Sequence, residues 1–347
     1  AMMGVPPVAG LWAAIAGMLG YALFGSSRTL IVGPDTATCT LIAATLTGMA
    51  LTTPEDRLVA ATGIALTVGV GCLVARVLRL GVLANLLSRP VLIGYMAGVA
   101  VTLALSQLSG LTGVGLRNSG LVHPFLELSR RMSEIRIPTL CLGVVSCLLL
   151  VAVKRWRPTW PGPILLVVGA CLLSWLFDFP SLGIAVVGEV PAGLPALSLP
   201  VRLEGVDNIL LGAAGVLVVS FSSGIVTARS FAARTGEHVD PNRELVGFGA
   251  ANVMAGLFQG FVVTGADSRT AVGLAAGGSS PLVGVSAAAA LAVVVGLLSA
   301  PLYWLPQAVL SAILLLAAVS LFDGQAFLRL ARISRIELAF GILAAVG

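Results

Sequence analysis

The chain is poor in charge. Asp, Glu, Lys and Arg together make up only 10% of its 347 residues, whereas 58% are hydrophobic and the mean hydropathy is +1.04. A soluble domain carries about 25% charged residues, so this composition indicates that most of the chain lies in lipid. Apolar runs of about 20 residues, enough to cross a bilayer as a helix, occupy 58–75, 91–108, 137–153, 161–177, 209–228 and 281–300.

These runs lack the alternation of polar and apolar residues that a membrane β-barrel requires. Only helices and closed barrels satisfy their backbone hydrogen bonds in hydrocarbon. We therefore expect an all-α polytopic membrane protein.

Potential metal ligands are scarce. The two histidines, His123 and His238, lie in predicted loops, and the five cysteines are scattered through apolar segments without a Cys-x-x-Cys pair. This pattern fits neither a zinc site nor a disulfide framework, and no secretory signal is present. We expect no metal, no cofactor and no enzymatic chemistry. The chain starts close to one apolar turn and stops inside another, so we interpret it as part of a longer protein.

The basic residues are distributed unevenly. Most arginines lie at segment ends on one side of the predicted threading, and acidic loops such as those with Glu55 and Asp207 lie on the other. The positive-inside rule makes the first side cytoplasmic, and this topological reading is preferred to a nucleic-acid role. Arg269 is the one basic residue without a place at an interface. Ionisable groups inside a membrane are costly, and they indicate a functional site by default.

Two short stretches in opposite halves carry the same pattern. Residues 33–38 read Gly-Pro-Asp-Thr-Ala-Thr and residues 265–270 read Gly-Ala-Asp-Ser-Arg-Thr. Each follows an apolar β-branched run and leads into another apolar segment of helical length. Paired interruptions at corresponding places are typical of the broken helices around a transporter's central site.

A helix that starts in mid-membrane has unpaired N–H groups and the positive end of its dipole at its first turn. Two such ends form an anion site. Gly33 and Gly265 permit close approach of a ligand, and Pro34 suits a first helical turn. Hydroxyl donors come from Thr36, Ser268 and Thr270. The full positive charge comes from Arg269.

Asp35 and Asp267 complicate this interpretation, since carboxylates would repel an anion unless they are paired or protonated. Asp267 can neutralise Arg269 in the empty site, and both aspartates are candidates for proton coupling. The alternative is that both motifs are ordinary N-caps. Outside the motifs, Glu244 is interpreted as a first-turn helix charge, and Asn252 as part of close helix packing.

Two polar loops, 114–136 and 178–208, divide the chain. We take 1–205 as the first half and 206–347 as the second, with inverted topology. Several ordered segments then show a resemblance to the SulP (solute carrier 26) anion transporter family. They are GVPPVAGLW (4–12), YALFGSSRTLIVGP (21–34), RPVLIGYMAG (89–98), VGEVPAGLP (187–195), ELVGFGAANVMAGLFQGFVVTGADSRTAV (244–272) and LPQAVLSAILL (305–315).

The resemblance implies fourteen spans in two inverted repeats of seven, with a truncated first span and a missing last span here. It implies core spans to about 80 and from about 209 to 300, and gate spans at about 84–180 and from about 306. The anion would lie between the breaks of the third span (Gly33, Pro34, Asp35) and the tenth (Thr264, Gly265, Ser268, Arg269), beside Ser223 of the eighth. The core would then move against the gate in an elevator-like step.

The expected function is secondary active transport of a small anion (bicarbonate, sulfate, chloride or a small carboxylate) by proton symport or anion exchange. The family also implies a bacterial inner-membrane location and a homodimer helped by a STAS domain that this chain lacks. Ser223 stands where many members carry an acidic residue, which weakens the case for proton coupling. A nucleobase–cation symporter, an anion channel or a voltage-driven motor are the alternatives, and an intramembrane aspartyl protease is a poor fit.

Overall fold

The computed structural model describes residues 3–49, 53–81, 89–116, 123–157, 160–189, 193, 197, 206–297 and 299–322. The chain divides into two compact units, Ala1–Leu92 with Pro191–Gly296 and Ile93–Val190 with Leu297–Gly347. Each unit is therefore assembled from two stretches that are separated in the sequence. The identity of these units with a core and a gate domain stays a prediction.

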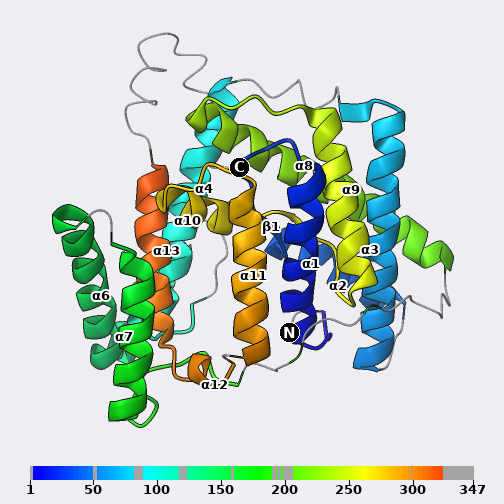
Figure 1. Ribbon diagram of the computed structural model, residues 1–347. Helices are drawn as coiled ribbons and strands as arrows, with labels where there is room; N and C mark the ends of the chain where they lie inside the picture. Colours follow the sequence, from blue (N-terminus) through cyan, green and yellow to red (C-terminus); the bar gives the residue numbers. More distant parts are fainter. Residues whose placement is uncertain are drawn as a thin grey trace. The chain divides into compact units, whose positions relative to one another are not determined.

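The first unit contains helices α1, α2, α3, α8, α9, α10 and α11 and two short strands (Figure 1). The bounds are α1 (Val8–Phe24), β1 (Val32–Gly33), α2 (Thr36–Gly48), α3 (Pro54–Val77), α8 (Val206–Thr235), α9 (Pro241–Leu257), β2 (Thr264–Gly265), α10 (Asp267–Ala275) and α11 (Leu282–Leu297). The second unit contains α4 (Arg89–Thr112), α5 (His123–Arg130), the 3-10 turn η2 (Met132–Glu134), α6 (Ile137–Trp156), α7 (Gly162–Phe177), α12 (Ser299–Leu302) and α13 (Gln307–Leu321).

The apolar runs predicted as spans coincide, to within a few residues at their ends, with helices α3, α4, α6, α7, α8 and α11. Among the described residues, four helices are long and apolar enough to cross a membrane: Pro54–Val77, Leu92–Thr112, Ile137–Trp156 and Ile209–Thr235. Helix starts follow local signals. Thr53 accepts a hydrogen bond from Asp56 N at 3.1 Å and precedes Pro54, while Asp240 accepts one from Asn242 N at 2.9 Å. Both are side-chain N-caps followed by proline.

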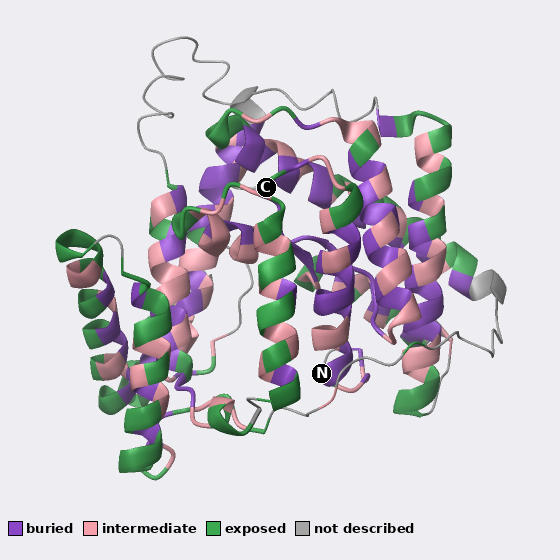
Figure 2. Cartoon of the chain, in the orientation of Figure 1, coloured by how far each residue is buried: buried purple, intermediate pink, exposed green. Residues whose placement is uncertain are grey.

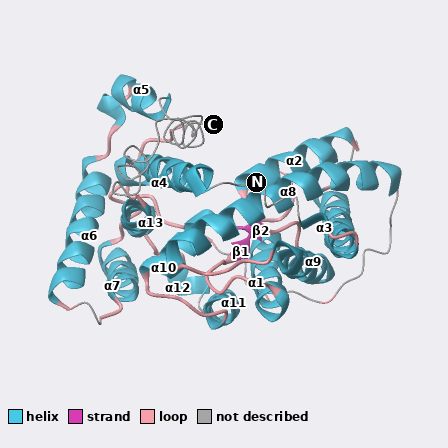
Figure 3. Ribbon diagram, turned by 90° about the horizontal axis from the view of Figure 1, so that it is seen from above, coloured by secondary structure: helices cyan, strands magenta, loops and turns pink. Residues whose placement is uncertain are grey.

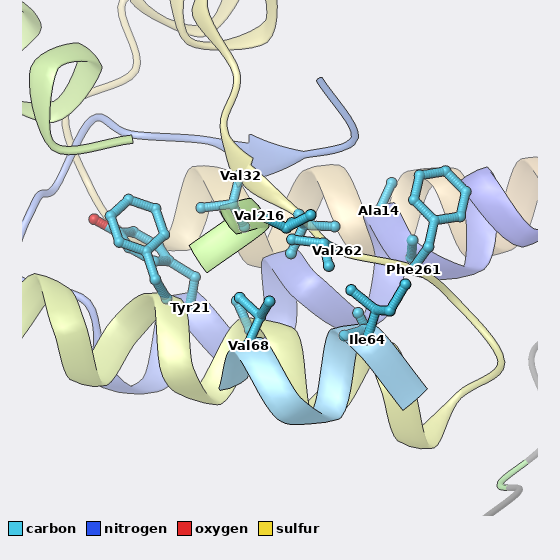
Figure 4. Packing of buried hydrophobic residues seen from close by; sticks show 14 of the residues in the cluster. Ala14, Tyr21, Val32, Ile64, Val68, Val216, Phe261 and Val262 are labelled. Atoms are coloured by element: carbon cyan, nitrogen blue, oxygen red, sulfur yellow. The ribbon is translucent and has the colours of Figure 1, made fainter. Parts of the chain in front are cut away.

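The core of the first unit forms where α1 and α3 pack against α9, and α8 against α3. Figure 4 shows Ala14 and Tyr21 of α1 together with Ile64 and Val68 of α3 in this cluster. Small residues bring the helices together: a Cβ on Gly69 would lie 2.8 Å from the backbone nitrogen of Val253. This is the close backbone approach typical of helix packing in membranes.

In the second unit, α13 packs against α6 and α7. Gln307 N donates to the carbonyl of Ala185 at 2.9 Å, which ties the start of α13 to the loop after α7. Many residues of helices α6 and α7 are exposed and are drawn green in Figure 2. Large apolar side chains such as Leu148 and Trp175 are among them. Apolar faces of this kind suit lipid contact.

Candidate anion-binding site

The two interrupted segments meet. Strands β1 and β2 pair antiparallel, with Val32 opposite Gly265 and Gly33 opposite Thr264. Figure 3 shows the pair, in magenta, between the helices of the first unit. Helix α2 begins shortly after β1, and α10 begins shortly after β2. The sequence predicted two interruptions, and the structure joins them backbone to backbone.

Side chains hold the strand pair in place. Thr270 Oγ1 accepts from Ile31 N at 3.1 Å, and Ala266 N donates to Ile31 O at 3.0 Å. Asn252, fully buried on α9, accepts from Val263 N at 2.9 Å and donates to Val263 O at 3.0 Å. The Asn252 amide therefore makes the two backbone hydrogen bonds that a neighbouring strand would otherwise make to Val263, just before β2. This role goes beyond the helix packing expected for Asn252.

The side chain of Arg269 lies against the β1–β2 strand pair. Its side chain reaches back from the first turn of α10, so that a Cβ on Gly33 would overlap its guanidinium group. The guanidinium Nη1 is buried and has no hydrogen-bond partner among the described residues. Asp35 is near enough for its charge to act on this guanidinium. A buried cation with an unused donor is what an anion site requires.

The start of α10 has no side-chain cap. Its N-cap is Ala266, which offers no side-chain cap, so the N–H groups of Ser268 and Arg269 lie in the first turn without an intrahelical acceptor. At α2, by contrast, the Asp35 carboxylate accepts from Ala37 N at 3.1 Å. The positive end of α10 is thus available to an anion, whereas that of α2 is partly occupied by its own cap.

Helix α8 crosses directly behind β2. A Cβ on Gly265 would lie 3.2 Å from both the Cα and the carbonyl oxygen of Gly224. The Thr264 hydroxyl donates to Ser220 O at 2.6 Å and is fully buried. The hydroxyl of Thr264 and the Cα of Gly265 therefore serve packing against α8. Ser223, half-buried, stands next to this crossing point.

The two aspartates make structural contacts. Asp35 is the N-cap of α2, as the capping alternative expected. Asp267 accepts from Thr227 Oγ1 at 2.8 Å, which joins α10 to α8. A coupling role for either carboxylate stays a prediction. Of the remaining predicted residues, Pro34 is half-buried and Thr36 is exposed at the first turn of α2.

Glu244 has a role beyond that of a first-turn helix charge. It is fully buried, and its carboxylate accepts four hydrogen bonds, from Ser26 N (2.9 Å), Ser26 Oγ (2.7 Å), Ser27 N (3.0 Å) and Tyr21 Oη (2.7 Å). Through these bonds Glu244 fixes the loop between α1 and β1. Its donors lie more than two hundred residues away in the sequence, so no local signal could reveal this.

The chain has a helical fold with exposed apolar helix faces, and its two interrupted segments pair with each other as β1 and β2. These features place it in the class of polytopic membrane transport proteins. The chain belongs to the sulfate permease family, whose pattern matches residues 1–344. It is therefore a member of a transporter family and not of an enzyme family, and the resemblance to the SulP (solute carrier 26) family is confirmed.

Individual relatives agree with this assignment. The chain is 41% identical over 340 residues to the probable sulfate transporter Rv1739c of Mycobacterium tuberculosis, covering 98% of this chain and 61% of that protein. It is 29% identical over 352 residues to the probable sulfate transporter 3.3 of Arabidopsis thaliana, of which it covers 56%. The chain thus spans about three fifths of the length of these curated relatives.

Solved structures show the same fold. The transmembrane domain of the cyanobacterial bicarbonate transporter BicA superposes with a TM-score of 0.70 at 27% identity, covering 99% of this chain and 88% of that one. The murine Slc26a9 anion transporter superposes with a TM-score of 0.70 at 21% identity, covering 99% and 63%. The expected membrane-domain fold is confirmed to this level. The division into seven plus seven inverted spans stays a prediction.

Proposed function

We propose that this chain is the membrane domain of a secondary transporter of small anions, with sulfate as the first candidate substrate. The observation that carries the proposal is Arg269, whose buried Nη1 lies at the β1–β2 strand pair and has no hydrogen-bond partner among the residues that the structure describes. The relatives point the same way, since they include a probable sulfate transporter and a bicarbonate transporter.

The geometry suits an oxyanion. An anion beside Gly33 would receive hydrogen bonds from the guanidinium of Arg269 and from the first-turn N–H groups of α10. Ser268 and Ser223 are the sequence neighbours of Arg269 and Gly224, and we expect their hydroxyls to add donors. Charge-assisted hydrogen bonds from a guanidinium and from backbone amides are strong because they act on a fixed geometry. The neutral hydroxyls at Ser268 and Ser223 add donors without adding negative charge.

The transport step we propose is a movement of the first unit, as a core, against the second unit, as a gate. Both interruptions, α8 and α10 belong to the first unit, so a bound anion would travel with it. Coupling would come from a proton or from a counter-anion. Asp35 and Asp267 are the carboxylates next to the site and therefore the candidates for a coupling proton. We also propose a homodimer in the bacterial inner membrane.

The test is uptake of radiolabelled sulfate into proteoliposomes, with and without an inward proton gradient, for wild type, Arg269→Ala and Arg269→Lys. Arg155→Ala, at the C-terminal end of α6, is the matched control. We expect saturable uptake that is lost in Arg269→Ala and weakened in Arg269→Lys, because lysine keeps the charge but not the planar donor set.

Competition by unlabelled bicarbonate, chloride, succinate and uracil identifies the substrate class. Competition by uracil alone would favour the nucleobase alternative, and unsaturable flux with large unitary currents would favour a channel. Normal saturable uptake by Arg269→Ala, in protein with the wild-type elution profile, would overturn the proposed role of Arg269.

A further inference from the structure

A second basic feature of the first unit lies away from Arg269. A cavity of about 650 Å³ opens between the loop after α1 and the start of α9, and Ser26, Arg28, Arg229 and Arg243 are among its lining residues. Its volume falls in the range of small-molecule sites and far exceeds what a single inorganic anion fills. None of the residues of the candidate anion site lines it.

The charge of this cavity is predominantly positive. Arg28, Arg229 and Arg243 line it together with His238, against one lining carboxylate, Asp240. That carboxylate is already engaged as the N-cap of α9. In the described part of the chain, the guanidinium groups of Arg28 and Arg243 form no ion pair.

One further carboxylate lies nearby. Glu237 is adjacent to His238 and accepts from the backbone N–H of Arg28 at 3.2 Å. This contact is made by the backbone of Arg28 and does not involve its guanidinium. With Glu237 and Asp240 both counted, the three arginines outnumber the carboxylates among the described residues at the cavity.

The backbone adds to the positive field. The first turn of α9, from Pro241 to Arg243, lines the cavity, so the positive end of a 17-residue helix faces it. The opposite wall is held firmly. Ser26 Oγ donates to Glu244 at 2.7 Å and accepts from Asp240 N at 3.2 Å. A wall fixed in this way needs little reordering when a ligand binds.

We propose that this cavity binds a phosphate-bearing ligand at a site separate from the transport site. A guanidinium group can donate two parallel hydrogen bonds to two oxygens of a phosphate group. Several arginines together favour a ligand with more than one negative charge. The cavity lies among helix ends, where both the headgroup of an anionic phospholipid and a phosphate compound from solution can reach. Phosphate is the chemistry that both sources share.

The experiment has two arms, both with the purified full chain and with sulfate in excess to occupy the candidate transport site. Calorimetric titration with inorganic pyrophosphate measures the soluble source. Native mass spectrometry of the protein in mixed micelles of phosphatidylcholine and phosphatidylglycerol measures retained anionic lipid. Wild type is compared with the double variant Arg28→Gln/Arg243→Gln and with the control Arg155→Gln.

We expect binding in at least one arm, weakened by about fivefold for each arginine removed from the cavity and unchanged in the control. A response to phosphatidylglycerol alone assigns a lipid headgroup, and a response to pyrophosphate alone assigns a soluble phosphate. Equal affinity of wild type and double variant in both arms, or an equal loss in Arg155→Gln, would overturn the site. Should the double variant not fold, the single variant Arg243→Gln decides, because its side chain is exposed.

Discussion

Replacing Glu244 tests whether the loop between α1 and β1 is fixed by a buried carboxylate. Among the described residues Glu244 has no Lys or Arg partner; its carboxylate depends on four donors from Tyr21, Ser26 and Ser27. Two effects oppose each other. Hydrogen bonds to a charged group stabilise by about 1.5–3 kcal/mol each, whereas burial of an ion without a counter-charge costs several kcal/mol.

The variants separate these effects. Glu244→Leu leaves at least Ser27 N and the Tyr21 hydroxyl buried without an acceptor, at about 1–3 kcal/mol each, so we expect a loss of roughly 2–6 kcal/mol. Glu244→Gln keeps one oxygen that accepts from Ser26 and Ser27, but its NH2 group replaces the oxygen that accepts from the Tyr21 hydroxyl. The charge assistance and this one acceptor are lost, and we expect a cost of about 1–2 kcal/mol. Tyr21→Phe removes a single donor and should cost about as much as Glu244→Gln.

The assay is the apparent melting temperature of the full chain in detergent, followed by loss of the monodisperse elution peak at one fixed heating rate. A fixed rate is needed because unfolding of such proteins is commonly irreversible. We expect the apparent melting temperature to be highest for wild type, lower and similar for Glu244→Gln and Tyr21→Phe, and lowest for Glu244→Leu. A Glu244→Leu protein as stable as wild type would refute the reasoning, since the cost of burying the charge would then outweigh its hydrogen bonds.

Three further variants address the strand crossing. Gly224→Ala places a methyl group 2.5 Å from an aromatic ring atom behind β2, so we expect sulfate uptake to fall at least tenfold; Gly215→Ala, on the same helix with nothing within 4 Å, should transport normally. Gly33→Ala displaces the Arg269 guanidinium, and uptake by the double variant Gly33→Ala/Arg269→Ala should be no lower than by either single variant, since both remove one interaction. Asp35→Asn keeps an N-cap of equal quality but removes the carboxylate proposed to carry a coupling proton. We therefore expect uptake to depend less on the proton gradient, and an unchanged dependence would restrict Asp35 to capping.

The helices and the two interruptions could be predicted because their signals are local. A run of apolar residues fixes a span, and the Gly-Pro-Asp sequence at residue 33 combines a turn former, a first-turn residue and a cap in three positions. Arg269 could be singled out because it is the one basic residue without a place at a membrane interface. These features need no knowledge of which segments become neighbours.

The contacts that stabilise the site could not be predicted, because each joins distant parts of the chain. Three contacts depend on how α8, α9 and α10 are placed. They are the pairing of Val32 with Gly265, the two hydrogen bonds between Asn252 and the backbone of Val263, and the hydrogen bond from Thr227 to Asp267. A polar residue in an apolar helix signals that a partner exists, but not which one.

The position of Asp35 relative to Arg269 bears on how such a site can release its anion. A buried guanidinium without a partner is costly, so an empty site would be poorly populated unless a nearby carboxylate reduced that cost. Asp35 can do so because its charge acts on Arg269 while its oxygen caps α2. The same carboxylate repels an anion, so it weakens binding as it stabilises the empty site. We therefore expect Asp35→Asn to tighten sulfate binding and to slow its release.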